Sequence, residues 1–402
     1  MKLTNLFSEE PLKSSIYVER FVNDAKGNFE DYSEVDVHYD PRGGTSIIRV
    51  PYALIPEEEC ALFKSEPSEE LCKWVHCDGK YRFFWHPDTQ RKGLGIDGYV
   101  EVQPTSSTRT LLTEDNPNVY IKTDLDKKHF RFVRRLRKSS VEHSIKICDD
   151  LRDFCKALPK NSRYSFLPES LGIVLKKGKH KDSGVLFRES KPYPYEEDPR
   201  VIIPYHSLYA GDVYKIEDKT LLIQILELHA QGSYLEYFVS EIVGPIVEAW
   251  VLLVSKRGLL PELHGQNALA EIDENFCIRR VVHRDFQSIY SDETIRKSLN
   301  LPLFEKHIAG EEAGTTIQSQ YSNVFDSMIG RYLIERMVKT FCDYFKINQH
   351  KTISAIKDYH RSISGWEKAK FPKEIYRFGT SAKEQQGNDV QLVSLGEKPK
   401  FR

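Results

Sequence analysis

The sequence has no closely spaced pair of cysteines. Its seven cysteines are an odd number, and none stands in a Cys-x-x-Cys pattern. Zinc ribbons need thiolate pairs at short spacing, and a secreted disulfide framework normally uses an even number of cysteines, so neither class is supported. The sequence therefore predicts reduced thiols in a cytoplasmic protein.

Long hydrophobic runs are also missing. The opening residues, MKLTNLFSEEPLKSS, contain no apolar core of the length that a secretory signal needs. The most apolar stretch, residues 242–254, is too short to cross a bilayer and contains Glu248. We therefore expect neither a secretory signal nor a membrane partner.

An excess of one charge is the third absence. The chain has 58 Lys and Arg against 59 Asp and Glu, for a formal net charge of −1. Non-specific affinity for nucleic acid depends on excess positive charge, so a nucleic-acid partner is not expected. This balance still allows one concentrated basic site.

The chain does contain enough apolar residues to form a folded core. With 402 residues, of which 40% are hydrophobic and 11% aromatic, the chain is long enough for two or three folded domains and too apolar to be disordered.

Three regions with different patterns predict an α+β fold. Residues 1–95 mix short apolar runs with acidic clusters and are expected to form a small N-terminal region. Residues 96–230 are rich in short β-branched runs that predict strands, interrupted by one helix at 139–158, and residues 231–402 carry helical periodicity. The expected strands are 98–102, 118–123, 173–177, 185–189, 201–204 and 213–216, and the expected later helices are 234–256, 321–344 and 352–363.

A hydroxyl-rich segment lies at residues 105–110, with the sequence TSSTRT. Hydroxyl groups, a guanidinium from Arg109 and free backbone N–H groups are what a loop needs to hold phosphate oxygens. Taken alone, such a loop is more often simply solvated. Its position before a basic segment favours an anion site.

That basic segment is residues 120–138, YIKTDLDKKHFRFVRRLRK, in a chain whose total charge is near zero. If the segment is helical, Arg131, Arg134, Arg135 and Lys138 lie on one face. A charge run is usually a solvated surface. Here it follows Lys122 on a predicted strand, and the combination predicts a pocket for a polyanion.

Two polar clusters frame a predicted hairpin further along the chain. The first is ELHGQN at residues 262–267 and the second is HRDF at 283–286. A return strand would bring Arg284 and Asp285 back beside Asn267. Oxygen ligands from Asn267 and Asp285, with Glu262 as a further candidate, suit Mg²⁺, which prefers few protein carboxylates together with substrate phosphates.

These four segments, in this order, resemble the siderophore synthetases that work independently of nonribosomal peptide synthetases, the IucA/IucC or aerobactin-synthetase-like family. The pieces that carry the resemblance are SSTRT at 106–110, YIKTDLD to RFVRRLR at 120–137, HGQN at 264–267 and RDF at 284–286. Each motif is short, and their shared order and spacing are the specific signal. The resemblance covers about residues 98 to 290.

The resemblance implies a ligase that depends on ATP and Mg²⁺. Such enzymes adenylate a carboxylate of citrate or a similar polycarboxylate and then join it to an amine or alcohol. The implied fold is a cupped hand of fingers and palm, with mixed or antiparallel sheets, a helical C-terminal part and a thumb reduced at the N-terminal side. The resemblance does not decide whether the protein forms a homodimer, because the shortened N-terminal region is the part that bears on dimerisation.

The resemblance also implies roles for individual residues. Nucleotide contacts are expected from Ser106, Ser107, Arg109, Thr110, Lys122, Gln266 and Asn267. Substrate contacts are expected from His264, Arg188 and either Arg134 or Arg135. The metal is expected at Glu262, Asn267 and Asp285, and the groups at the reaction itself are His264, Arg109, Lys122 and Arg134.

Two other classes fit part of the sequence. A kinase-like small-molecule phosphotransferase would also place strands before helices and an Asn ahead of a hairpin that ends at Asp285. The HRD fragment is not a protein-kinase loop, because the Asn expected five residues after the Asp is Tyr290. A non-catalytic homologue that only binds nucleotide is the third possibility, and the presence of every candidate catalytic position argues against it.

Overall fold

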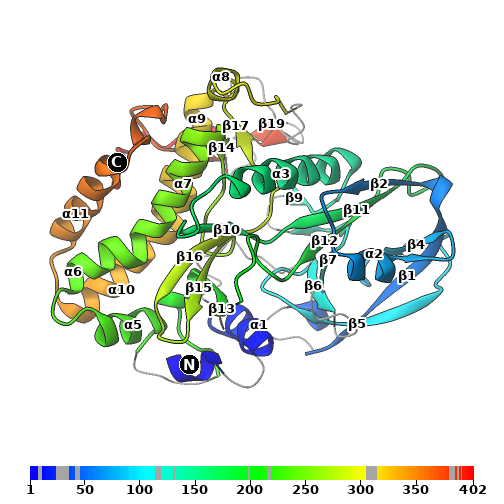
Figure 1. Ribbon diagram of the computed structural model, residues 1–402, viewed down its shortest axis with the longest axis horizontal. Helices are drawn as coiled ribbons and strands as arrows, with labels where there is room; N and C mark the ends of the chain where they lie inside the picture. The colour runs from blue at the N-terminus through cyan, green and yellow to red at the C-terminus, as the bar shows by residue number, and fades with distance from the viewer. Residues whose placement is uncertain are drawn as a thin grey trace.

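The structure is a computed structural model, and it describes residues 1–7, 11–23, 36–40, 46–89, 91, 93–113, 119–129, 132–197, 200–214, 219–304, 315–379, 385–386, 389–390 and 392–402. Figure 1 shows a β-rich half and a helical half, with a smaller sheet between them. The predicted α+β class, with antiparallel and mixed sheets and a helical C-terminal part, is confirmed.

The β-rich half is a nine-stranded antiparallel sheet in the order β2-β11-β12-β7-β6-β5-β1-β4-β3. Only residues 57–59 join β1 to β2, although five strands lie between them in that order, so the sheet curls round on itself. Its strands are β1 (Ile48–Pro56), β2 (Cys60–Lys64), β3 (His76–Cys77), β4 (Lys80–Phe84), β5 (Gly98–Pro104), β6 (Thr110–Thr113), β7 (Val119–Lys122), β11 (Glu169–Leu175) and β12 (Gly184–Glu189). Strands from the expected N-terminal and middle regions therefore share one sheet, and the three-part division of the chain stays a prediction.

The inner face of the curl is filled by alternate apolar side chains of these strands, among them Val50, Phe83, Val102, Ile121 and Phe187. Period-two alternation places every second residue on this face, which is why short β-branched runs predicted the strands. Helix α2 (Glu69–Val75) adds Leu71 and Val75 to this core, and helix α3 (Lys138–Lys156) packs against β11 on the other side (Figure 1).

A four-stranded sheet connects this half to the helices. Its order is β10-β16-β15-β13, with β10 parallel to β16 and the other pairs antiparallel. The strands are β10 (Tyr164–Phe166), β13 (Arg200–Pro204), β15 (Ala268–Asp273) and β16 (Ile278–His283). Short pairs β14 (Leu259–Leu260) with β17 (Tyr290–Ser291), β8 (Lys128–His129) with β9 (Phe132–Val133), β18 (Tyr376–Phe378) with β21 (Leu392–Ser394) and β19 (Gln385–Gln386) with β20 (Asp389–Val390) complete the strands described.

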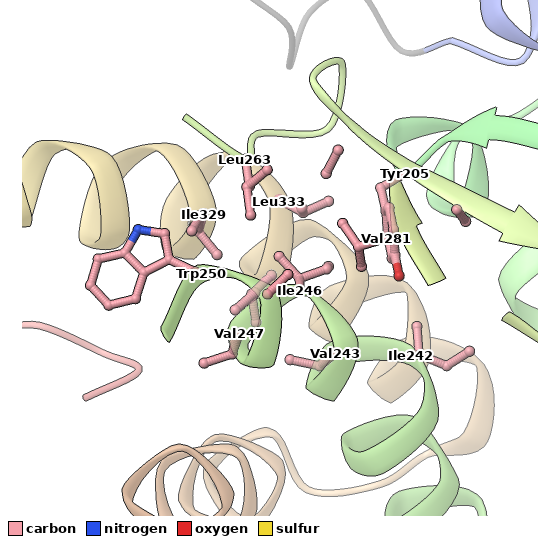
Figure 2. Packing of buried hydrophobic residues seen from close by; sticks show 14 of the residues in the cluster. Tyr205, Ile242, Val243, Ile246, Val247, Trp250, Leu263, Val281, Ile329 and Leu333 are labelled. Carbon is pink, nitrogen blue, oxygen red and sulfur yellow. The ribbon is translucent and has the colours of Figure 1, made fainter. Parts of the chain in front are cut away.

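The largest core lies between the four-stranded sheet and the helices. Figure 2 shows Ile246 and Trp250 of α7 among Val281 and Tyr205 from the sheet side and Leu333 from a later helix. The helices are α1 (Pro11–Phe21), α4 (His206–Tyr209), α5 (Leu221–His229), α6 (Tyr234–Tyr237), α7 (Gly244–Arg257), α8 (Glu293–Ser298), α9 (Ile317–Ser322), α10 (Glu335–Phe345) and α11 (Gln349–Ser362), with π-helical segments at Phe238–Val243 and Asn323–Ile334.

The predicted helix at 234–256 is confirmed as a continuous run through α6, a π-helical turn and α7. Pro245 stands in the first turn of α7, where its missing N–H matters least, and the π-helical turn directly precedes it. This run, Tyr234–Arg257, is the one described helix long and apolar enough to cross a membrane, with 24 residues, and 78% of its most apolar window is buried inside the protein. The apolar residues 242–254 lie within this run.

Two local predictions are wrong. Val213 and Tyr214 form a bend rather than a strand, because the Asp212 carboxylate accepts a hydrogen bond from the Tyr214 backbone N–H at 3.0 Å; residues 215–218 lie outside the described part. The basic segment is not a helix either. After β7 it forms the β8–β9 hairpin and then an extended stretch up to α3, and Arg131 lies outside the described residues.

Gly258 ends α7 in the left-handed conformation, with φ of 61°. A Cβ there would lie 2.9 Å from the backbone oxygen of Asp292. Strain and contact together should make Gly258→Ala lower the free energy of unfolding by about 2–4 kcal/mol, measured by urea denaturation. The control Gly178→Ala, at φ of 77° with open space around the Cβ, should lose only about 1 kcal/mol. Equal losses would show that the contact with Asp292 is unimportant.

Candidate functional site

The four predicted segments meet where the two sheets join, since hydrogen bonds link each of them to another. The hydroxyl loop connects β5 to β6, residues 261–267 connect β14 to β15, and residues 284–289 follow β16. Ala268 pairs with His283 in the hairpin register, and the Arg284 N–H donates to the Asn267 carbonyl at 3.1 Å. The predicted return of Arg284 and Asp285 beside Asn267 is confirmed.

The hydroxyl loop holds its own shape. The Thr105 hydroxyl donates to the Thr110 carbonyl at 2.8 Å and accepts from the Ser107 N–H at 3.0 Å. Thr105, Ser106 and Thr110 are buried, whereas Ser107 is half-buried. The Gln266 side chain donates to the Ser106 hydroxyl at 3.0 Å, so two segments that lie 160 residues apart are in direct contact.

Arg109 is the buried cation of this loop, with an exposed fraction of 7%. Its guanidinium donates to the Arg134 carbonyl at 2.7 Å and to Oε1 of Gln287 at 3.1 Å, and both acceptors are uncharged. Among the described residues it forms no ion pair, and burial lowers the pKa of Arg109. A buried arginine without a carboxylate partner is costly unless an anion comes to it.

Lys122 lies deeper in the junction and is already paired. Its Nζ donates to Oδ1 of Asp285 at 2.7 Å and lies 3.5 Å from Oε1 of Glu169, which also binds Arg188 at 2.5 Å. Burial opposes ionisation of Asp285, but the positive charges of Lys122 and Arg188 outweigh it and hold the pKa of Asp285 well below its usual range. Arg188 is thus neutralised by Glu169, beneath the more exposed Asp285.

The two candidate arginines of the basic segment turn to different sides. Arg135 is half exposed and binds Asp126 at 2.7 Å. Arg134 instead acts electrostatically on both Glu262 and His264. Asp124 fixes this arrangement, because it accepts the Leu136 N–H at 2.7 Å and so ties the returning chain down. The charge of Arg134, and not that of Arg135, therefore acts on Glu262 and His264.

Leu263 explains how the ELHGQN segment presents its polar groups. Its side chain is fully buried in the helical core (Figure 2), whereas its neighbours Glu262 and His264 are only half-buried. The Leu263 backbone N–H donates to the Pro261 carbonyl at 3.1 Å, which holds this segment in a tight turn. Burial raises the pKa of Glu262 to about 7, and the neighbouring charge of Asp285 adds to this rise, while the hydroxyl of Ser288 donates to its carboxylate at 2.9 Å.

His264 is a neutral imidazole near pH 7. Burial lowers the pKa of His264 to about 4, and Arg284 and Arg134 lower it further against the opposing effect of Asp285. The backbone N–H of Gln266 donates to Nδ1 at 3.2 Å, which makes Nδ1 the acceptor and places the ring proton on Nε2. The ring can therefore offer an Nε2–H donor to a ligand oxygen.

Two buried carboxylates escaped the sequence reasoning. Glu19 of α1 binds Arg284 and Ser106, and Glu169 of β11 binds Lys122 and Arg188. Glu169 opens β11, ahead of the predicted strand at 173–177, and pairs across the register with Arg188 of the predicted strand at 185–189. Glu19 stands 87 residues before the loop that it contacts, and nothing in its local sequence marks it.

No group of three or more His, Cys, Asp or Glu side chains gathers as a metal centre within the described part of the chain. The predicted metal residues include the Asn267 amide, and they are hard oxygen donors of the kind Mg²⁺ takes. A cation held by Glu262 and Asp285 would offset the burial and the neighbouring negative charge that together raise the pKa of Glu262. The donor chemistry of these residues fits a magnesium ion.

Comparison with known proteins defines the class of fold. The chain is similar to the petrobactin biosynthesis protein AsbB from Bacillus anthracis str. Sterne, with a TM-score of 0.65, 18% identity, and coverage of 87% of this chain and 68% of that one. It is also similar to the aerobactin synthetase IucC from a hypervirulent pathotype of Klebsiella pneumoniae, with a TM-score of 0.65, 12% identity, and coverage of 86% of this chain and 69% of that one. For the ATP-bound aerobactin synthetase IucA from the same source, the TM-score is 0.64 and the identity 14%, with coverage of 85% of this chain and 67% of that one.

The fold is therefore that of the siderophore synthetases. Residues 92–210, which include the hydroxyl loop and the basic segment, match the IucA / IucC family. The predicted resemblance to this family is confirmed over these residues, and the similar structures extend the likeness to the fold. No curated protein matches the sequence.

Proposed function

We propose that the protein is an ATP- and Mg²⁺-dependent synthetase that activates a carboxylate of citrate or a similar polycarboxylate as an acyl-adenylate and joins it to an amine or alcohol. Siderophore-type biosynthesis is the expected setting. The family match and the shared fold support this class, and one of the similar structures is described as ATP-bound.

Arg109 is the observation that carries the proposal. It is a buried guanidinium whose hydrogen bonds go to a backbone carbonyl and a carboxamide, whereas Arg188 and Arg284 bind carboxylates. Arg109 has thus kept its positive charge available for a ligand. The partly exposed Ser107 hydroxyl lies in the same loop, so phosphate oxygens are the anion that both groups suit.

The proposed chemistry asks for charge stabilisation more than for acid–base groups. Bringing a substrate carboxylate onto the α-phosphate forces negative charges together, and Arg109 and Arg134 would offset that repulsion as the charge develops. The Nε2–H of His264 would donate to an oxygen of the phosphate or the carboxylate. Gln266 and Asn267 would line the nucleotide site.

Lys122 and Asp285 have a linked role. Asp285 neutralises Lys122 in this structure, so a cation that binds Asp285 would release the lysine charge towards the phosphates. Glu262, Asn267 and Asp285 are the residues that would hold magnesium. The ion, when bound, supplies charge neutralisation on the phosphate oxygens.

The second half of the reaction needs less from the protein. An acyl-adenylate is already activated, so an amine that arrives deprotonated and well placed can attack without a strong general base. An alcohol would need a general base, and Glu262, with a pKa of about 7, is the named group suited to that task. Amine and alcohol co-substrates are therefore both proposed.

The experiment that tests the function is a pyrophosphate-release screen. Citrate, 2-oxoglutarate, succinate and amino-dicarboxylates are each incubated with ATP, Mg²⁺ and a panel of polyamines and hydroxylated amines, and products are identified by mass. AMP with pyrophosphate is the expected result. ADP with a phosphorylated product would support the kinase-like alternative, for which the close pairing of Asn267 with the Arg284–Asp285 turn is the favouring feature.

His264→Ala gives a sharper check within that assay. Losing one preorganised donor to developing charge should lower kcat for pyrophosphate release by about 100- to 1,000-fold. Because the imidazole is neutral, wild-type kcat should show no dependence on a histidine titrating near pH 6.5. Normal release by this variant would contradict the role given to Nε2.

A further inference from the structure

Helix α1 occupies an unusual position, because it packs on both halves of the molecule. Ile16 lies with Leu112 and Tyr120 of the nine-stranded sheet, while Val18 and Val22 belong to the large core beneath the four-stranded sheet. Figure 1 shows α1 beside β13, next to the loops that join the two sheets. A helix in this place can hold the two halves of the site in a fixed relation.

Glu19 is the polar centre of that helix and is 4% exposed. Its Oε1 accepts from the Ser106 N–H at 3.0 Å, from the Ser106 hydroxyl at 2.8 Å and from Nη2 of Arg284 at 2.7 Å. Its Oε2 accepts from Nη1 of Arg284 at 3.0 Å. One carboxylate therefore binds the hydroxyl loop and the turn after β16 at the same time.

Arg284 extends the same connection to the third segment of the site. Its Nε donates to the Gln266 carbonyl at 3.0 Å, and the Gln266 side chain returns to the Ser106 hydroxyl at 3.0 Å. Burial would raise the pKa of Glu19, but Arg284 and Ser106 hold it at about 2. The closed set of Glu19, Arg284, Gln266 and Ser106 is a charged, hydrogen-bonded clamp around the predicted nucleotide loops.

We propose that Glu19 is a positioning residue that sets the hydroxyl loop against the Arg284 turn, and so shapes the nucleotide site without touching the nucleotide. The proposal rests on the proposed function for its ligand, but the clamp itself can be tested without turnover. Because Glu19 neutralises Arg284, it also leaves Arg109 as the cation of the loop that is available to an anion.

The test compares Glu19→Gln with Glu271→Gln. Glu271 is an equally buried carboxylate that binds Arg280 through both oxygens, at 2.5 and 2.9 Å, and Arg200 at 3.1 Å, away from the hydroxyl loop. Both variants remove one buried negative charge that pairs with arginine, so both should lose stability. Only Glu19→Gln should speed hydrogen exchange in peptide 103–110, by at least about 10-fold, because the Ser106 N–H loses its charged acceptor.

The kinetic readout separates positioning from general destabilisation. Glu19→Gln should raise the KM for ATP at least about 10-fold with kcat changed less than about threefold, and Glu271→Gln should leave both near wild type. Glu19→Asp should recover part of the loss. If Glu19→Gln does not fold, Ser106→Ala keeps the Glu19–Arg284 pair and should still raise the ATP KM by about 3- to 10-fold, since it removes the hydroxyl contacts.

Each outcome bears on the proposal. Unchanged exchange in 103–110 in Glu19→Gln, or equal effects in the Glu271→Gln control, would overturn it. If wild-type protein releases no pyrophosphate with any substrate, the proposed function fails, and the exchange measurement still decides whether Glu19 holds the loop.

Discussion

Replacing Arg109 with alanine should reduce pyrophosphate release by at least about 1,000-fold while the protein stays folded. Among the proposed phosphate-binding residues, Arg109 is the buried cation whose hydrogen bonds go to neutral acceptors. Its positive charge can therefore stabilise the negative charge that develops in the transition state. Arginines that stabilise transferring phosphoryl groups contribute factors of about this size. The measurement is a steady-state assay of kcat/KM for ATP.

The thermal stability of an uncharged Arg109 variant provides a second test. Burial of this cation costs free energy in the free enzyme, whereas its hydrogen bonds to the Arg134 carbonyl and to Gln287 stabilise the loop. Because these effects oppose each other, Arg109→Met, which fills similar volume without charge, should change the melting temperature little. A catalytic loss together with a large fall in stability would instead mean that Arg109 mainly supports the loop.

The control for Arg109 comes from the basic segment. Arg135→Ala removes an equal charge from a half-exposed residue that pairs with Asp126, and should change activity less than about twofold. Arg134→Ala should lose activity strongly, because the charge of Arg134 acts on Glu262 and His264. If Arg135→Ala were the damaging substitution, the orientation of the basic segment would be wrong.

The sequence alone could predict those parts of the site that local patterns bring together. The hairpin between Asn267 and Arg284 was foreseeable, because a turn of Asp273, Glu274 and Asn275 between two β-branched runs leaves little choice of register. The helix α3 was equally readable, since its apolar residues recur at three- and four-residue steps and all of them are buried.

The failures have physical reasons of a different kind. The basic segment has helical spacing, but Asp124 binds the backbone of Leu136 and Arg109 binds the carbonyl of Arg134, and these contacts hold the chain extended. These tertiary hydrogen bonds outweigh the helical propensity of the segment. Glu19 could not be found at all, because its partners are Ser106 and Arg284, far along the chain.

Glu262→Gln should raise stability and destroy metal-dependent activity in the same protein. The pKa of Glu262 is about 7 in the folded chain against an ordinary value of 4.5, so the folded state holds more protons between these values. Stability from this group is therefore present at low pH and is lost as the pH rises through about 7. At pH 8 in EDTA the ionised carboxylate should cost about 1–3 kcal/mol, which glutamine avoids.

Urea denaturation from pH 5 to pH 8 tests this directly. The gain in the free energy of unfolding from Glu262→Gln should be near zero at pH 5 and should increase towards pH 8. The exposed control Glu274→Gln should show no such trend. Adding Mg²⁺ with ATP should stabilise the wild type more than the variant, because the carboxylate pair of Glu262 and Asp285 then gains its counter-charge. A variant that is less stable at pH 8, or that keeps the full response to Mg²⁺, would remove Glu262 from the proposed metal site and leave Asp285 and Asn267 to hold the ion.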